Sequence, residues 1–238
     1  MSLPNPRVIA REVSARVRCR LIDTKTITIG GTTARFNVGT PTELHRVTNT
    51  TEDEQVLSEL TADIEPGDVF YDIGANIGIY SCLVGVGRPD ISVVAVEPHP
   101  ENSARASENL ALNDIDAPVH QVAFGNESRN MTLQQSPDSR ARDEAGIGHF
   151  RIANGGQGYD VRVVRGDEYI ENQPIESPTV VKIDVEGAEE AVIRGLKETL
   201  ARDSFRLLYC EIHPALGADE TAIAERLERV GFSLTEME

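Results

Sequence analysis

Short apolar runs alternate along the chain with longer segments whose apolar residues recur at helical spacing. Val69–Ile73, Ile91–Val96 and Val180–Asp184 are rich in Val and Ile, which is typical of strands buried on both faces of a parallel sheet. Val119–Phe124 and Phe205–Ile212 predict two further strands. Because strands and helices alternate in this way, the chain is predicted to adopt an α/β fold with a doubly wound, mostly parallel sheet.

Five helices are predicted around these strands. They cover residues 52–62, 77–85, 100–113, 186–201 and 220–230. Pro100 suits the first turn of its helix, where a missing amide hydrogen costs nothing. Pro66 and Gly67 end the first helix just before the first parallel strand. After the last helix, Phe232–Leu234 predicts one short strand at an edge of the sheet.

Residues 1–63 are organised differently from the rest of the chain. Val17–Ile22, Thr26–Ile29 and Thr33–Val38 are short β-type runs separated by turn residues. They predict an N-terminal antiparallel β meander, which the helix at 52–62 joins to the main domain at residues 64–238. The meander either covers the mouth of a ligand site or only packs against the edge of the sheet.

A connection of more than fifty residues, at about 125–179, separates the third and fourth predicted strands. Connections of that length are commonly functional or disordered. Tyr159–Val164 alternates like a strand and Asp167–Ile170 predicts a short helical turn, whereas residues 136–146 are polar and charge-dense. We expect an insertion on the substrate side of the fold, and the alternative is that residues 140–148 are a disordered loop.

A glycine-rich turn follows the first parallel strand. Asp72-Ile-Gly-Ala-Asn-Ile-Gly78 contains the spacing G-x-x-x-G, and Glu97 ends the next strand about 20 residues later. Doubly wound nucleotide sites use such a turn to approach the ligand and such a carboxylate to bind the ribose hydroxyls. Asp72 would repel the pyrophosphate of a dinucleotide but suits a cationic ligand such as S-adenosylmethionine. The alternative is a purely structural strand-to-helix turn.

Three motifs in a fixed order narrow this hypothesis. The glycine turn is followed by Lys182-Ile-Asp-Val-Glu-Gly-Ala-Glu189 and then by Glu211-Ile-His213. The combination resembles the FkbM family of class I, Rossmann-like methyltransferases, from about Glu52 to Gly231. The resemblance implies S-adenosylmethionine as the cofactor and O-methylation of a hydroxyl on a small molecule, a glycan or a polyketide-like acceptor. The usual sheet of such methyltransferases closes with an antiparallel pair of strands, of which this chain supplies only the first.

The resemblance and the nucleotide-site pattern together assign the cofactor-binding residues. The methionine part is expected at the glycine turn, the ribose at the end of the second strand and the adenine beside it. The predicted residues are Asp72, Gly74, Ala75, Asn76, Gly78, Glu97, Pro98, His99, Val122 and Ala123. Among them, Glu97 is expected to bind the ribose, and His99 to line the adenine pocket with Val122 and Ala123.

Catalysis is expected at the C-terminal ends of the strands, where open α/β sheets bind their ligands. Asp184 ends the fourth strand or caps the next helix, and Glu211 and His213 alternate onto one side of the fifth strand. His213 is the preferred general base, because its unperturbed pKa of about 6.5 lies near working pH. A metal-free site is expected, and its rival is a divalent cation held by these three residues. Glu186 and Glu189 are expected only to favour the start of their helix.

The charge balance argues against nucleic acid as a partner. The chain has 39 acidic and 23 basic residues, a formal charge of −16 and only three lysines. Such a surface repels phosphate backbones, so an RNA methyltransferase, which the run Glu108–Asn113 also fits, is the weaker hypothesis. A non-catalytic S-adenosylmethionine-binding protein is the other alternative. High acidity with little lysine also resembles proteins of salt-loving organisms, in which salt screens the repulsion between carboxylates.

Cysteine usage and hydropathy bear on the cellular setting. Cys19, Cys82 and Cys210 are too few and too scattered for a zinc cluster or a disulfide framework, so reduced thiols are expected. No apolar run reaches the roughly 20 residues that cross a bilayer, and the first residues lack the apolar block of a signal peptide. We therefore expect a soluble, cytoplasmic protein without a membrane partner. No motif identifies the acceptor or the oligomeric state.

Overall fold

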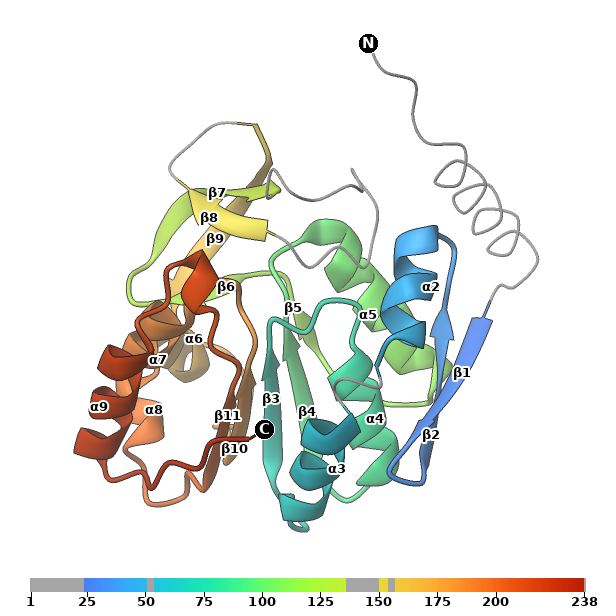
Figure 1. Cartoon of the computed structure of the whole chain (residues 1–238), viewed down its shortest axis with the longest axis horizontal. Coiled ribbons are helices and arrows are strands. Elements are labelled where there is room, and N and C mark those ends of the chain that lie inside the picture. The colour runs from blue at the N-terminus through green and yellow to red at the C-terminus, as the bar shows by residue number, and fades with distance from the viewer. Residues whose placement is uncertain (1–23, 51–53, 136–149, 154–156, 238) are drawn as a thin grey trace.

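The centre of the molecule is a sheet of five parallel strands in the order β11-β10-β3-β4-β5. This computed structural model describes residues 24–50, 54–135, 150–153 and 157–237. The strands are β3 (Val69–Ile73), β4 (Ser92–Val96), β5 (Val119–His120), β10 (Val180–Ile183) and β11 (Leu207–Cys210). The predicted α/β fold with a parallel sheet is thus confirmed (Figure 1).

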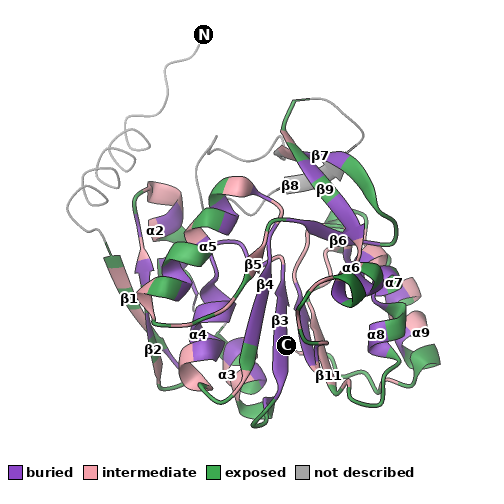
Figure 2. Cartoon of the chain, turned by 180° about the vertical axis from the view of Figure 1, so that it is seen from behind, coloured by how far each residue is buried: buried purple, intermediate pink, exposed green. Residues whose placement is uncertain are grey.

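Helices cover both faces of this sheet (Figure 1). One layer contains α3 (Glu54–Asp63), α4 (Ile79–Gly87) and α5 (Pro100–Leu112), and the other contains α6 (Gly166–Asn172), α7 (Glu189–Gly195), α8 (Lys197–Leu200) and α9 (Glu220–Val230). Neighbouring side chains of a strand point to opposite faces, so Phe70 packs in the cluster with α4 and Tyr71 in the cluster with α7. Both are fully buried, which explains why this strand is apolar on both faces (Figure 2).

The N-terminal segment contains an antiparallel hairpin, β1 (Thr24–Ile29) and β2 (Thr32–Asn37). These strands confirm the second and third β-type runs, and the first run, Val17–Ile22, lies outside the described residues. The buried side chains of Phe36 and Val38 share one hydrophobic cluster with residues of α3 and α4. The hairpin therefore packs on the helices of the core and does not extend the parallel sheet.

A short helix, α2 (Pro41–Thr48), follows the hairpin and was not predicted from the sequence. Its start is fixed by a capping box, in which the Thr40 hydroxyl accepts from the Glu43 amide and the Glu43 carboxylate accepts from the Thr40 amide. The carboxylate of Glu43 is fully buried and also accepts a hydrogen bond from Arg105 Nε of α5 at 2.5 Å. This ion pair holds α2 against α5.

The predicted strand Val119–Phe124 is wrong as a single element. β5 ends at His120, the amide of Val122 donates to the carbonyl of His120, and the chain then enters a second sheet. This sheet has the order β6-β9-β7-β8. Its strands are β6 (Ala123–Gly125), β7 (Arg129–Gln135), β8 (Phe150–Ala153) and β9 (Tyr159–Arg165). The described part of the long connection thus contributes three strands to a second sheet and the helix α6, and the loop predicted at 140–148 lies outside the described residues.

The predicted helix at 186–201 is divided into α7 and α8. The Asp167 carboxylate accepts hydrogen bonds from the amides of Glu198 and Thr199, each at 2.9 Å, and so caps a new helix start. Sequence periodicity gives no sign of this cap, because Asp167 lies about 30 residues earlier in the chain. β11 is also shorter than the predicted Phe205–Ile212.

The predicted terminal strand Phe232–Leu234 is not a strand. The amide of Phe232 instead donates to the carbonyl of Leu227, and its ring packs against that of Phe205 with centroids 5.7 Å apart. Within the described residues, no antiparallel strand joins the five-stranded sheet. The described helices also include none that is long and apolar enough to span a membrane.

Candidate functional site

A cavity of about 920 Å³ opens at the C-terminal ends of the central strands. Its walls come from the loops after β3, β4, β10 and β11, from α2 and from the second sheet. They include His45, Arg46, Asn49, Gly74, Asn76, Glu97, Pro98, Val122, Ala123, Leu133, Asp184, Glu186, Glu211 and His213. This edge of an open α/β sheet is the usual ligand site, and the volume suits a ligand of drug size or larger.

The glycine turn brings two backbone segments into direct contact. Gly74 has a φ of 82°, and a Cβ built on it would lie 1.9 Å from the carbonyl oxygen of Asp184. Its amide and that of Ala75 both donate to the carbonyl of Val96. A side chain at position 74 would therefore push the loop after β10 away from the turn, which explains the glycine.

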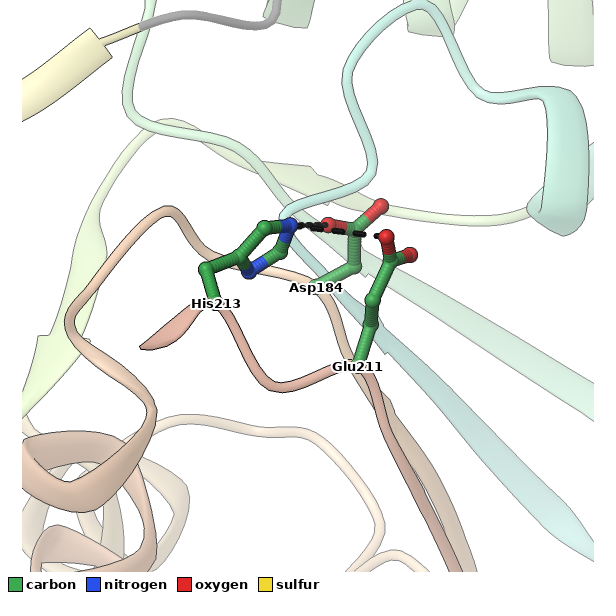
Figure 3. Close-up of side chains that lie close together, drawn as sticks. All are labelled: Asp184, Glu211 and His213. Carbon is green, nitrogen blue, oxygen red and sulfur yellow. Dashed lines mark ion pairs between the residues drawn. The ribbon is translucent and has the colours of Figure 1, made fainter. Parts of the chain in front are cut away.

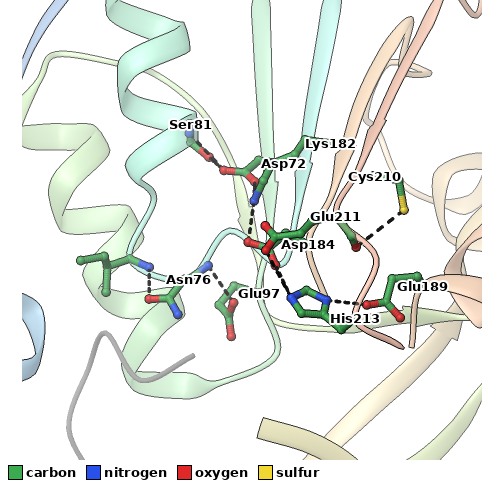
Figure 4. A network of polar contacts seen from close by, with 11 residues as sticks. Asp72, Asn76, Ser81, Glu97, Lys182, Asp184, Glu189, Cys210, Glu211 and His213 are labelled. Carbon is green, nitrogen blue, oxygen red and sulfur yellow. Dashed lines mark hydrogen bonds and ion pairs between the residues drawn. The ribbon is translucent and has the colours of Figure 1, made fainter. Parts of the chain in front are cut away.

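Asp72 lies beneath this turn, and its carboxylate is fully buried. One carboxylate oxygen accepts from the Ser81 amide at 3.0 Å and from the Ser81 hydroxyl at 2.6 Å, while the other lies 3.5 Å from Lys182 Nζ. Asp72 is not among the residues that line the cavity. The structure therefore places this carboxylate where it stabilises the start of α4 and pairs with Lys182 (Figure 4).

Glu97 lines the cavity next to the turn. Its Oε2 accepts from the Asn76 amide and its Oε1 from the His99 amide, each at 2.8 Å. Burial raises the pKa of Glu97 to about 7, although these two backbone hydrogen bonds oppose the shift. Each carboxylate oxygen keeps a lone pair, so a hydroxyl group in the cavity can still donate to it.

The other predicted cofactor residues fall into two groups. Gly74, Asn76, Glu97, Pro98, Val122 and Ala123 line the cavity. Asp72, Ala75, Gly78 and His99 are not among the lining residues. His99 is fully buried and caps α5 by accepting a hydrogen bond from the Asn102 amide on Nδ1, and its ring lies edge-on to that of Tyr159.

Lys182 lies between Asp72, beneath the glycine turn, and Asp184, at the end of β10. Its ammonium lies 3.1 Å from Asp184 Oδ2 and 3.5 Å from Asp72 Oδ1, and it stacks over the ring of Tyr80 at 4.3 Å. Burial lowers the pKa of Lys182, but the two carboxylates outweigh burial and leave the pKa raised. For Asp184, burial alone would raise the pKa, but the positive charges of Lys182 and Arg46 outweigh burial. The net effect is a lowered pKa. Asp184 is therefore ionised at neutral pH.

His213 meets three carboxylates. Its Nδ1 lies 2.6 Å from Glu189 Oε1, and its Nε2 lies 3.4 Å from Glu211 Oε1 and 3.9 Å from Asp184 Oδ1 (Figures 3 and 4). The hydrogen bond to Glu189 and the nearby carboxylate of Glu211 raise the pKa of His213 to about 10, against the effect of burial. The expectation that its pKa lies near working pH is wrong, because the carboxylates favour the imidazolium form.

Glu186 and Glu189 do more than face the helix dipole. Glu189 is fully buried, and its Oε1 lies 2.6 Å from His213 Nδ1. The same oxygen accepts a hydrogen bond from the Gly187 amide at 3.2 Å. Glu186 lines the cavity, and burial raises its pKa to about 7. The sequence held a signal for both residues, since they belong to the motif that contains Asp184.

Arg46 is the cavity residue that sequence reasoning missed most clearly. α2 presents it together with His45 at the wall of the cavity, and Asn49, which directly follows the helix, lies at the same wall. Its positive charge lowers the pKa of Asp184 and opposes the rise in the pKa of Glu97 and Glu186. Thr40 and Glu43 have the spacing of a capping box, and this was the available signal for α2.

Comparisons with known proteins place the chain among methyltransferases. Residues 72–234 match the methyltransferase FkbM domain. The chain is 28% identical to the hexuronic acid methyltransferase AglP of Haloferax volcanii, over 86% of this chain and 80% of AglP. It is 27% identical to the 31-O-demethyl-FK506 methyltransferase FkbM of Streptomyces tacrolimicus, over 83% of this chain and 84% of that protein. It also aligns with precorrin-6y C5,15-methyltransferase of Geobacter metallireducens, at 16% identity and a TM-score of 0.47, over 76% of this chain and 72% of that one.

Proposed function

Because the chain belongs to the FkbM family of methyltransferases, we propose that it transfers a methyl group from S-adenosylmethionine to a hydroxyl oxygen of a small molecule or a glycan. The observation that carries the proposal is the cavity at the C-terminal edge of the sheet. A glycine turn and a ribose-type carboxylate form one part of its wall, and a cluster of carboxylates around a histidine forms another. A nucleoside cofactor suits the first part, and an acceptor suits the second.

The first part of the wall fits S-adenosylmethionine. Gly74 keeps the turn free of side chains, and Glu97 has lone pairs available for the ribose hydroxyls. Val122 and Ala123 offer apolar surface for the adenine. When bound there, the cofactor supplies an electrophilic methyl group. Asp72 acts indirectly, because it fixes the start of α4 and neutralises Lys182 behind the turn.

Asp184, Glu211 and His213 are assigned to the acceptor. They lie at the ends of β10 and β11 and line the same cavity as Glu97. Asp184 is fixed by Lys182, so its other oxygen can accept a hydrogen bond from an acceptor hydroxyl and orient that oxygen. His213 is held by Glu189 from the opposite side of its ring, which fixes the direction of Nε2.

The relatives and the charge of the chain support the choice of acceptor class. The relatives are named for a hexuronic acid and for 31-O-demethyl-FK506, neither of which is a nucleic acid. The excess of 39 acidic over 23 basic residues disfavours a polyanionic RNA. Arg46 at the cavity wall suits an acceptor that carries a negative group, such as an acidic sugar.

The test is methyl transfer from S-adenosylmethionine labelled in its methyl group. Purified full-length protein is incubated with hydroxyl-bearing glycans, uronic-acid glycosides, hydroxylated natural products and, as a comparison, transfer RNA. We expect label in one class of the hydroxyl acceptors and none in RNA. Label in RNA alone would contradict the proposal. Binding of S-adenosylhomocysteine without transfer to any acceptor would favour a non-catalytic binding protein.

A further inference from the structure

Two carboxylates and an imidazole converge where β10 and β11 end (Figure 3). Asp184 follows β10 directly, and Glu211 and His213 follow β11 two residues apart. One ligand atom from each residue can be chosen so that all three lie within 4.8 Å of one another. Because all three side chains line the cavity beside Glu97, they meet at the acceptor side of the proposed reaction.

The distances within this cluster are longer than those of direct charged hydrogen bonds. His213 Nε2 lies 3.4 Å from Glu211 Oε1 and 3.9 Å from Asp184 Oδ1, whereas N⁺–H···O⁻ bonds are about 2.7–2.9 Å long. Two neighbouring ligand atoms that each lie about 2.0–2.2 Å from one octahedral metal ion are separated by about 2.8–3.1 Å. The His213–Glu211 pair, at 3.4 Å, needs to close by only a few tenths of an ångström to reach this separation. The Glu211 side chain is 56% exposed, so it is free to adjust toward Asp184.

The residues around the cluster leave its ligand atoms available. Asp184 Oδ2 accepts from Lys182 at 3.1 Å, so Oδ1 remains on the side of His213. On the far side of the imidazole ring, Nδ1 contacts the fully buried Glu189 at 2.6 Å, and the amide of Gly187 also donates to Glu189. Metal-binding histidines almost always donate their second ring nitrogen to a carboxylate or carbonyl in this way.

We propose that Asp184, Glu211 and His213 bind one divalent cation of the Mg²⁺ and Mn²⁺ class, which holds the acceptor hydroxyl beside the cofactor. Two hard carboxylate oxygens and one imidazole nitrogen suit such an ion, and the remaining coordination positions face the cavity. The inference rests on the proposed methyl transfer, but it concerns a step that the rest of the site does not supply.

The cation solves the problem of removing the proton of the hydroxyl. A hydroxyl bound to a divalent cation has a lowered pKa, so its proton passes to solvent and its oxygen keeps the electron pair. That pair forms the new bond to the methyl carbon, while the carbon–sulfur bond breaks and the sulfur keeps its electrons. On cation binding, the imidazolium releases its Nε2 proton to solvent, so that the Nε2 lone pair faces the ion while the Nδ1 hydrogen stays directed at Glu189.

The test is a titration of the full-length protein with Mn²⁺, after removal of metal by EDTA and desalting, with saturating S-adenosylhomocysteine present. Free Mn²⁺ is measured by electron paramagnetic resonance. We expect one bound Mn²⁺ per chain, and no specific binding in Asp184→Asn or His213→Gln. Glu189→Gln keeps all three ligands but loses the carboxylate behind the imidazole, so its affinity should fall about 10–100-fold. Glu228→Gln, an exposed change on α9 with the same change in charge, should bind Mn²⁺ like the wild type.

Melting curves and calorimetry with S-adenosylhomocysteine separate the possible failures. A variant that melts and binds S-adenosylhomocysteine like the wild type, yet binds no Mn²⁺, supports the site. Wild-type protein that binds S-adenosylhomocysteine but no Mn²⁺, or His213→Gln protein that still binds Mn²⁺, overturns the cation and leaves the methyltransferase proposal standing. Failure to bind S-adenosylhomocysteine overturns the proposed function itself.

Discussion

The carboxylate of Glu97 offers the sharpest test of the cofactor site, because both of its oxygens already accept from backbone amides. Oε2 accepts from Asn76 and Oε1 from His99, each at 2.8 Å. In Glu97→Gln, the side-chain NH₂ group faces one of these N–H donors whichever way the amide is turned. A buried N–H without an acceptor costs about 1–3 kcal/mol. The melting temperature should therefore decrease by an amount between a few degrees and about 10 °C.

The same substitution removes the charge that the ribose is proposed to bind. A hydrogen bond to a charged group contributes about 1.5–3 kcal/mol, so the affinity for S-adenosylhomocysteine should fall about 10–150-fold. Because burial raises the pKa of Glu97 to about 7, the carboxylate is mostly protonated below neutral pH and mostly ionised above it. Wild-type affinity should therefore rise up to about tenfold between about pH 6 and about pH 8.

Isothermal titration calorimetry at the two pH values measures both effects. Glu186→Gln is the matched control, because Glu186 lines the same cavity and burial also raises its pKa to about 7. The control should keep the pH dependence, and Glu97→Gln should lose it. Unchanged affinity in Glu97→Gln, with the pH dependence intact, would refute the assignment of Glu97 to the ribose.

Three further predictions concern the turn, the acceptor side and the surface. Gly74→Ala places a methyl group 1.9 Å from the carbonyl oxygen of Asp184, so it should lower the melting temperature and abolish S-adenosylhomocysteine binding. Gly217→Ala is its control, because the new Cβ meets nothing within 4 Å, and it should lower the stability only by the strain of its positive φ. His213→Ala removes a side chain that positions the acceptor, so the rate of methyl transfer should fall about 10²-fold with cofactor affinity nearly unchanged, and near-normal turnover would exclude a role in catalysis. Molar KCl should raise the melting temperature by screening the 39 acidic residues, and melting that does not respond to salt would refute a halophilic adaptation.

The central strands were predictable because tertiary structure and local sequence agree there. β3, β4 and β10 are buried on both faces, so most of their residues are apolar, and their ends agree with the ends of the apolar runs to within one residue. The same logic failed at Val119–Phe124. There the chain turns after His120 to pair with β9, a partner that lies about 40 residues further along the chain, and an apolar run does not reveal which sheet it joins.

The candidate site likewise has a part that the sequence predicts and a part that it does not. Gly74, Glu97 and Asp184 each follow the end of a predicted parallel strand, which is enough to place them at one edge of the sheet. The pKa of His213 was not predictable, because it depends on Glu189 of α7, which lies 24 residues earlier in the chain and meets the imidazole only in the folded structure. The contribution of Arg46 depends likewise on the buried ion pair between Glu43 and Arg105 that holds α2 in place.

A crystal structure of the protein with S-adenosylhomocysteine tests the central claim most directly. The proposed function predicts the ligand in the cavity, with the ribose hydroxyls within hydrogen-bonding distance of Glu97 and the amino acid part over the turn from Gly74 to Gly78. Its sulfur should face the ends of β10 and β11, where Asp184 and His213 lie. A ligand bound elsewhere at saturating concentration, or a cavity that stays free of it, would contradict the account.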